Sequence, residues 1–110
     1  MQDQVPALAY ARNGVTIVRP RGAMDIARRD ELIASLRECT GDVVVDLSDV
    51  EFLDASCLAF LLAEHARLVE HGGMLRVREP HGIVSRLLEA AGVATWLVDD
   101  GARSRPRLID

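Results

Sequence analysis

Residues 43–58, VVVDLSDVEFLDASCL, join a buried strand to the start of a long helix, and this stretch decides the fold. The nearly continuous β-branched run Val43–Leu47 is typical of a strand covered on both faces, so we expect it in the middle of the sheet. A helix is predicted over Ser56–His71, because the following Gly72-Gly73 pair supplies a residue that can adopt the left-handed cap conformation. Ser56 therefore stands where the backbone N–H groups of a first helical turn lack partners.

Apolar periodicity on either side of this stretch predicts alternating strands and helices. Asn13-Gly14 suits a two-residue hairpin turn, and Pro20 places the end of the second strand at an edge or a bulge. The predicted elements are strands at Ala7–Arg12 and Val15–Arg19, a helix at Ile26–Cys39, a strand at Met74–Arg78, a helix at Gly82–Ala91 and a strand at Ala94–Val98. This order predicts an α/β fold with a mostly parallel sheet of about five strands, an N-terminal antiparallel hairpin and three or four helices.

Size and composition predict a single domain over residues 1–98, followed by a polar tail or short final element at 99–110. The chain has 110 residues, of which 49% are hydrophobic and 27% charged, and this suits one hydrophobic core. No apolar run is long enough to cross a bilayer and no signal peptide is recognisable, so we expect a cytoplasmic protein without membrane insertion. The net charge of -4 argues against nucleic-acid binding, and the absence of lysine excludes lysine-dependent catalysis.

The helix predicted over residues 56–71 has two distinct faces when successive residues are placed 100° apart. The expected core face carries Leu58, Leu61, Leu62, His65, Leu68 and Val69. The opposite face carries Ser56, Phe60, Ala63 and Arg67, so one partner could touch a hydroxyl and an aromatic ring together. Two alternatives stay open: Phe60 can be an incidental exposed residue, and Ser56 can serve only in N-capping, a role that Asp54 or Ala55 could also fill.

Several segments together resemble the STAS domain family of anti-sigma factor antagonists. Residues 46–58, DLSDVEFLDASCL, are similar to the family run D-L-S-x-V-x-F-x-D-S-S-G-L, which leads into a helix. Residues 22–25, GAMD, resemble the family's G-E-L-D turn, and residues 72–75, GGML, resemble its G-G-x-L. Val84, Leu87 and Leu88 followed by Gly92 are similar to its V-x-x-L-L-x-x-x-G-L helix end. The resemblance covers the chain from about Ala7 to Val98 and implies a STAS-like fold.

The resemblance also implies a partner-switching role. In that role the unphosphorylated protein binds an anti-sigma factor that is also a serine kinase, which releases a sigma factor for transcription. Phosphorylation of the motif serine ends the binding, and a serine phosphatase is expected to restore it. Matched residue by residue, Ser56 is the phosphorylation site, and Asp25, Asp54 and Cys57 form its surroundings. A new phosphate beside Asp54 would repel an acidic or apolar partner surface.

The chain departs from the family pattern at two positions of the motif. Ala55 replaces the first serine, which costs little because the second serine carries the modification. Cys57 replaces the following glycine and adds a side chain where the family keeps the backbone open, which bears on kinase access and partner choice. The face with Phe60, Ala63 and Arg67 is the predicted partner-binding surface.

Other chemistries fit these residues less well. Ser56 lacks the G-x-S-x-G turn of a hydrolase nucleophile. Cys57 would be reactive if the helix start lowered its thiol pKa, whereas its place at the border of the core face favours an inert packed cysteine. The histidines show no metal-ligand spacing, so no metal, other cofactor or enzymatic activity is predicted. Within the family, the alternative is a non-phosphorylated scaffold or accessory subunit of a stress-signalling or lipid-transport complex.

Overall fold

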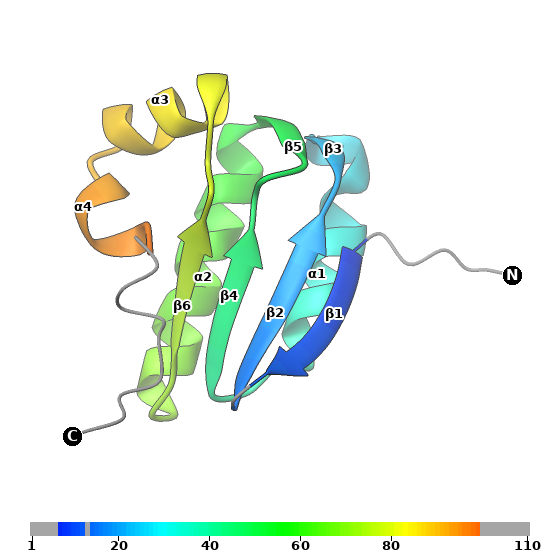
Figure 1. The fold of residues 1–110 in the computed structure, drawn as a ribbon, viewed down its shortest axis with the longest axis vertical. Coiled ribbons are helices and arrows are strands. Elements are labelled where there is room, and N and C mark those ends of the chain that lie inside the picture. Colours follow the sequence, from blue (N-terminus) through cyan, green and yellow to red (C-terminus); the bar gives the residue numbers. More distant parts are fainter. Residues whose placement is uncertain (1–6, 13, 100–110) are drawn as a thin grey trace, which may run out of the picture.

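The structure is a computed structural model that describes residues 7–12 and 14–99. Its main sheet consists, within these residues, of β1 (Ala7–Arg12), β2 (Val15–Pro20), β4 (Asp42–Asp46) and β6 (Met74–Arg78), in the order β1-β2-β4-β6 (Figure 1). β1 runs antiparallel to β2, whereas β2, β4 and β6 are parallel, so the predicted α/β fold with an N-terminal hairpin is confirmed. Gly14 has the positive φ of 81° that the predicted turn requires, while Asn13 and the predicted tail beyond Asp99 lie outside the described residues.

Two long helices, α1 (Arg29–Arg37) and α2 (Ala55–Glu70), cover one face of the main sheet and lie behind it in Figure 1. A single 3-10 turn, η1 (Ile26–Arg28), precedes α1, so the helix predicted over residues 26–39 is divided in two. The helix α3 (Gly82–Ala90) packs against β5, and the short α4 (Ala94–Leu97) lies beside β6. The strand Val43–Leu47 was predicted to be central, and β4 does lie between β2 and β6.

A second, two-stranded sheet joins β3 (Gly22–Met24) to β5 (Val50–Leu53), which run parallel. The sequence pattern predicts only a turn around residues 22–25. At one end of the pair the Gly22 N–H donates to the Asp49 carbonyl at 2.8 Å, and at the other the Asp54 N–H donates to the Met24 carbonyl at 3.1 Å. These bonds bring the residue after β3, Asp25, beside the start of α2.

The strand predicted over Ala94–Val98 is wrong, because most of this segment is the short helix α4. Only Val98 lies along β6, in an isolated parallel bridge to Val77. The edge of β6 is already occupied at Leu75, whose N–H and carbonyl oxygen lie 3.2 and 2.9 Å from Nδ1 of His65. His65 Nδ1 engages one of these two groups at a time and lies where a longer fifth strand would pair, and a helical turn instead buries Leu97 completely.

The core lies between the sheet and the helices, and the predicted core face of α2 needs correction. On α2 the residues Leu58, Leu61 and Leu68 are buried as predicted, but Val69 is 50% exposed. On α3 Val84 and Leu88 are buried, whereas Ile83 is 57% exposed, although it shares their apolar stripe. Periodicity gives the direction of a side chain but not whether another element lies in that direction.

Gly73 allows the turn after α2 to pass against the turn before β4. A Cβ atom at Gly73 would collide with the backbone of Gly41, whose carbonyl accepts the Met74 N–H at 3.2 Å. We expect Gly73→Ala to lower the free energy of unfolding by about 3 kcal/mol, because backbone atoms cannot give way as a side chain can. Gly72→Ala is the matched control: its φ of 87° is unfavourable, but its Cβ would meet nothing within 4 Å, so the expected cost is about 1 kcal/mol.

Urea unfolding followed by circular dichroism measures both losses. Equal losses in the two variants would show that the turns do not meet at Gly73.

Candidate functional site

The carboxylate of Asp54 organises the first turn of α2. Asp54 is the N-cap residue, with extended backbone (φ -87°, ψ 168°), and its Oδ1 accepts the Cys57 N–H at 3.0 Å. The same oxygen accepts the hydroxyl of Ser56 at 2.7 Å. The Ser56 hydroxyl, followed by the Cys57 N–H, lowers the pKa of the Asp54 carboxyl. Asp54 is thus the N-cap among the three candidates, and Ser56 is a partly buried first-turn residue held by it.

Asp25 reaches the same place from a distant part of the sequence. Its carboxylate caps η1 by accepting the Arg28 N–H at 3.2 Å, and its carbonyl accepts the Cys57 thiol at 3.7 Å. The residues predicted to surround the phosphorylation site, Asp25, Asp54 and Cys57, therefore do gather at the start of α2. The β3–β5 pair provides this geometry, because Met24 and Leu53 are partners in its register.

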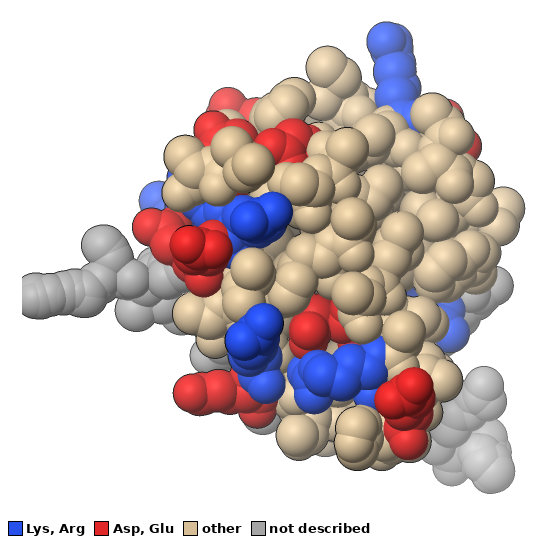
Figure 2. Space-filling view, turned by 180° about the vertical axis from the view of Figure 1, so that it is seen from behind, with Lys and Arg blue, Asp and Glu red and all other residues tan. Residues whose placement is uncertain are grey.

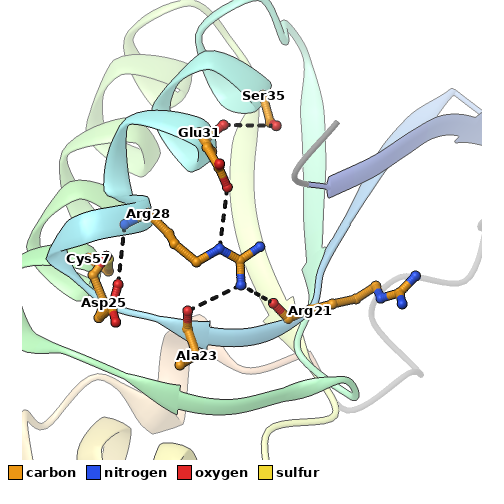
Figure 3. A network of polar contacts seen from close by, with 7 residues as sticks. All are labelled: Arg21, Ala23, Asp25, Arg28, Glu31, Ser35 and Cys57. Atoms are coloured by element: carbon orange, nitrogen blue, oxygen red, sulfur yellow. Dashed lines mark hydrogen bonds and ion pairs between the residues drawn. The ribbon is translucent and has the colours of Figure 1, made fainter. Parts of the chain in front are cut away.

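Arg28 fastens η1 to the free edge of β3, as Figure 3 shows. Its Nη1 donates to the carbonyls of Arg21 at 2.7 Å and Ala23 at 3.3 Å, and its Nε donates to Glu31 at 3.3 Å. Gly22 leaves room for this side chain, since a Cβ there would lie 3.2 Å from Nη1. No sequence pattern identifies Arg28, because two of its partners are backbone carbonyls.

Cys57 is an inert, packed cysteine, as one of the two alternatives predicted. Its side chain is fully buried. Burial, and next the neighbouring Asp54 charge, raise the pKa of the Cys57 thiol to about 11. The alternative of a reactive thiolate activated by the helix start is therefore wrong. At neutral pH the sulfur keeps its proton, and the thiol donates a hydrogen bond to the Asp25 carbonyl.

The predicted outward face of α2 is only partly outward. Ala63 is exposed, but Phe60 is partly buried and packs against the core, so its ring does not simply point away from the domain. Arg67 turns toward α1, where its Nη2 donates to the carbonyls of Leu36 at 3.4 Å and Cys39 at 3.1 Å. It also pairs at 2.8 Å with Glu64, a buried carboxylate. Arg67 caps the end of α1 and is a structural residue.

One broad face of the domain carries few charged side chains. Seen from behind, the face that α2 and α3 present is largely without charged side chains, which lie mainly around its margin (Figure 2). The exposed residues of α2 on and near this face include Ala55, Ala59, Ala63, Ala66 and Val69. Three large apolar side chains that the sequence pattern does not single out are exposed: Ile26 on η1, which contacts β3, Phe52 on β5, and Ile83 on α3, which contacts β5.

A family model described as Mlab, STAS domain, matches residues 8–99. The chain belongs to the STAS domain family. Among solved structures it is similar to the unphosphorylated anti-sigma factor antagonist SpoIIAA, with 13% identity, coverage of 89% of this chain and 91% of the other, and a TM-score of 0.73. The phosphorylated form of SpoIIAA from Bacillus gives 12% identity, coverage of 89% and 95%, and a TM-score of 0.67.

An anti-sigma factor antagonist from Mycobacterium paratuberculosis is 25% identical, with coverage of 86% of this chain and 84% of the other and a TM-score of 0.70. These likenesses show that the chain has the same fold as these proteins. A comparison with curated proteins gives no match. None of the described helices is both long and apolar enough to span a membrane.

Low pH should weaken the stabilisation that the Asp54 N-cap gives to α2. Because the folded-state pKa of Asp54 lies below its ordinary value of 3.8, the ionised cap stabilises the fold above that value. This stabilisation is lost as the pH falls from about 3.8 through the lower folded-state pKa. We expect Asp54→Asn to flatten this acid limb in urea midpoints measured between about pH 3 and 7, because asparagine caps without titrating.

Asp42→Asn, a change at an exposed position of β4, is the control and should leave the Asp54-dependent part of the limb in place. Asp46 adds to the same limb: although burial opposes the shift, the Ser48 hydrogen bonds and Arg78 lower its pKa. The readout is therefore the difference between variants, and identical slopes for Asp54→Asn and Asp42→Asn would contradict the cap.

Removing the Arg67 side chain should destabilise the domain. Arg67→Ala leaves the buried Glu64 carboxylate unpaired and two carbonyls at the end of α1 without a donor, so we expect a loss of about 2 kcal/mol. Arg37→Ala, on the exposed last turn of α1, removes the same charge and should cost less than about 0.5 kcal/mol. Thermal unfolding distinguishes the two variants. An unchanged melting curve for Arg67→Ala would show that Arg67 does not stabilise the fold and would favour its predicted role in partner binding.

Proposed function

We propose that this STAS domain is an anti-sigma factor antagonist switched by phosphorylation at Ser56. In the unmodified state it binds an anti-sigma factor that is also a serine kinase, and the sigma factor is released for transcription. The observation that carries the proposal is the Ser56 hydroxyl, which Asp54 holds at 2.7 Å at the start of α2. A protein kinase then finds a partly buried serine of fixed orientation, hydrogen-bonded to a carboxylate.

Phosphorylation would change this end of the domain electrostatically. A kinase transfers the γ-phosphoryl group of a nucleoside triphosphate to Oγ, the hydroxyl proton passes to a base of the kinase, and the nucleoside diphosphate leaves. The product carries about 1.5 to 2 negative charges and can no longer donate a hydrogen to Asp54. An apolar partner surface that fits the neutral hydroxyl would have to bury this charge, which is strongly unfavourable.

The proposed partner surface is the uncharged face of α2 around Ala59 and Ala63, together with the exposed side chains Phe52 and Ile26. Small residues let a partner helix approach closely, and the two large side chains offer apolar area to bury. Phe60 supports this surface from its edge by packing between α2 and the core. Arg67 contributes to this surface indirectly, by holding α2 against the end of α1.

Several further properties belong to the same proposal. A serine phosphatase removes the phosphate and restores binding, the protein acts in the cytoplasm, and residues 1–98 act as one domain with 99–110 as an appended segment. No helix of the described residues offers a membrane span that would conflict with this location.

The test mixes the purified protein with a candidate anti-sigma kinase and nucleoside triphosphate and follows intact mass. We expect one added phosphoryl group, mapped to Ser56, that Ser56→Ala abolishes and the matched change Ser85→Ala on α3 does not. In binding measurements Ser56→Ala should bind like the unmodified protein, and Ser56→Asp should bind at least about tenfold more weakly.

Equal affinities for Ser56→Ala and Ser56→Asp would refute the switch. A kinase that binds the domain but adds no phosphate would refute phosphorylation and leave the scaffold or accessory-subunit role.

A further inference from the structure

Two successive arginines at the junction of η1 and α1 are in very different situations. Arg28 donates through Nη1 to two backbone carbonyls of the β3 edge and through Nε to Glu31. Arg29, the first residue of α1, has its Nε buried without a hydrogen-bond partner, and its guanidinium forms no ion pair with any residue that the structure describes. A buried guanidinium nitrogen without an acceptor is costly, and it marks a position prepared for an anion.

Arg29 lies close to the first turn of α2. η1, which leads directly into Arg29, begins at Asp25, and the Asp25 carbonyl accepts the thiol of Cys57. α1 and α2 also pack side by side. The electrostatic effect agrees with this placement: burial and Asp54 raise the pKa of the Cys57 thiol, while the positive charge of Arg29 opposes them. Cys57 is the residue that directly follows Ser56.

A phosphate on Ser56 would need a cation at this place. The Asp54 carboxylate, which accepts the unmodified hydroxyl at 2.7 Å, would repel a phosphate, and Asp25 adds a second carboxylate nearby. The first-turn N–H group of Cys57 is already taken by Asp54. Arg28 is held by the β3 edge, so Arg29 is the uncommitted cation that the packing of α1 brings to this turn.

We propose that Arg29 binds the phosphate group of phosphorylated Ser56 and so joins the first turn of α1 to the first turn of α2. This inference rests on the proposed phosphorylation of Ser56 and names the side chain that binds the phosphate. Planar guanidinium groups pair with phosphate oxygens through charge-assisted hydrogen bonds, which are stronger than neutral ones. The phosphorylated state is then a rigid alternative surface, with the added charge fixed in place.

The experiment installs phosphoserine at position 56 during translation, so no kinase is needed, and titrates the phosphate by ³¹P NMR. A free phosphoserine has its second pKa near about 6, and a neighbouring cation lowers it. We expect this pKa to be lower by about half a unit to one unit in the wild-type sequence than in Arg29→Gln. Arg37→Gln, which removes the same charge at the other end of α1, should keep the lowered value, and Arg29→Lys should keep part of it.

A second readout covers the possibility that Arg29→Gln disturbs the fold. The melting temperature is compared between phosphorylated and unphosphorylated forms of each variant, so any intrinsic loss cancels. Phosphorylation should lower the melting temperature of Arg29→Gln more than that of Arg37→Gln.

Equal ³¹P midpoints, or equal melting shifts, in Arg29→Gln and Arg37→Gln would overturn the assignment of Arg29 while leaving Ser56 as a phosphorylation site. Failure of every candidate kinase would instead count against the proposed function and would not alter the NMR result.

Discussion

The carboxylate of Asp54 is the constraint on which the site depends. One of its oxygens accepts both the Cys57 N–H, which starts α2, and the hydroxyl of Ser56, which orients the serine. Because the helix cap and the serine share an acceptor, the conformation of the hydroxyl is coupled to the integrity of the first turn. A change in the charge of Ser56 therefore acts on the backbone of α2 as well as on any bound partner.

The small β3–β5 sheet gives Asp54 its position. The Asp54 N–H donates to the Met24 carbonyl, so the cap is attached to β3, and Arg28 secures the outer edge of that strand. The site is thus built from two segments about thirty residues apart, joined mainly by backbone hydrogen bonds, which depend little on side-chain identity. An arrangement of this kind is compatible with the low identity, 12 to 25%, between this chain and solved structures of the same fold.

Much of the fold and part of the site could be predicted from the sequence, and the failures have physical causes. The strand at Val43–Leu47, the start of α2 and the grouping of Asp25 with Asp54 follow from local patterns or from the family motif. Arg28 was missed because it bonds to carbonyls. Phe60 and Arg67 were placed by helical angle alone, which does not show that Phe60 packs on the core or that α1 offers open carbonyls to Arg67. The apolar composition of the segment after α3 favours a strand, but it does not show that His65 lies at the edge of β6.

The histidine at that edge has a consequence for how the domain can associate with other chains. Free N–H and carbonyl groups along an outer strand invite pairing with a strand from another molecule, which leads to sheet extension and aggregation. On β6 the His65 Nδ1 lies beside both the N–H and the carbonyl of Leu75 and engages one of them at a time, and the Val77 carbonyl accepts the Asp99 N–H at 2.6 Å. These contacts cover part of this edge, so pairing with a strand from another chain is disfavoured along it.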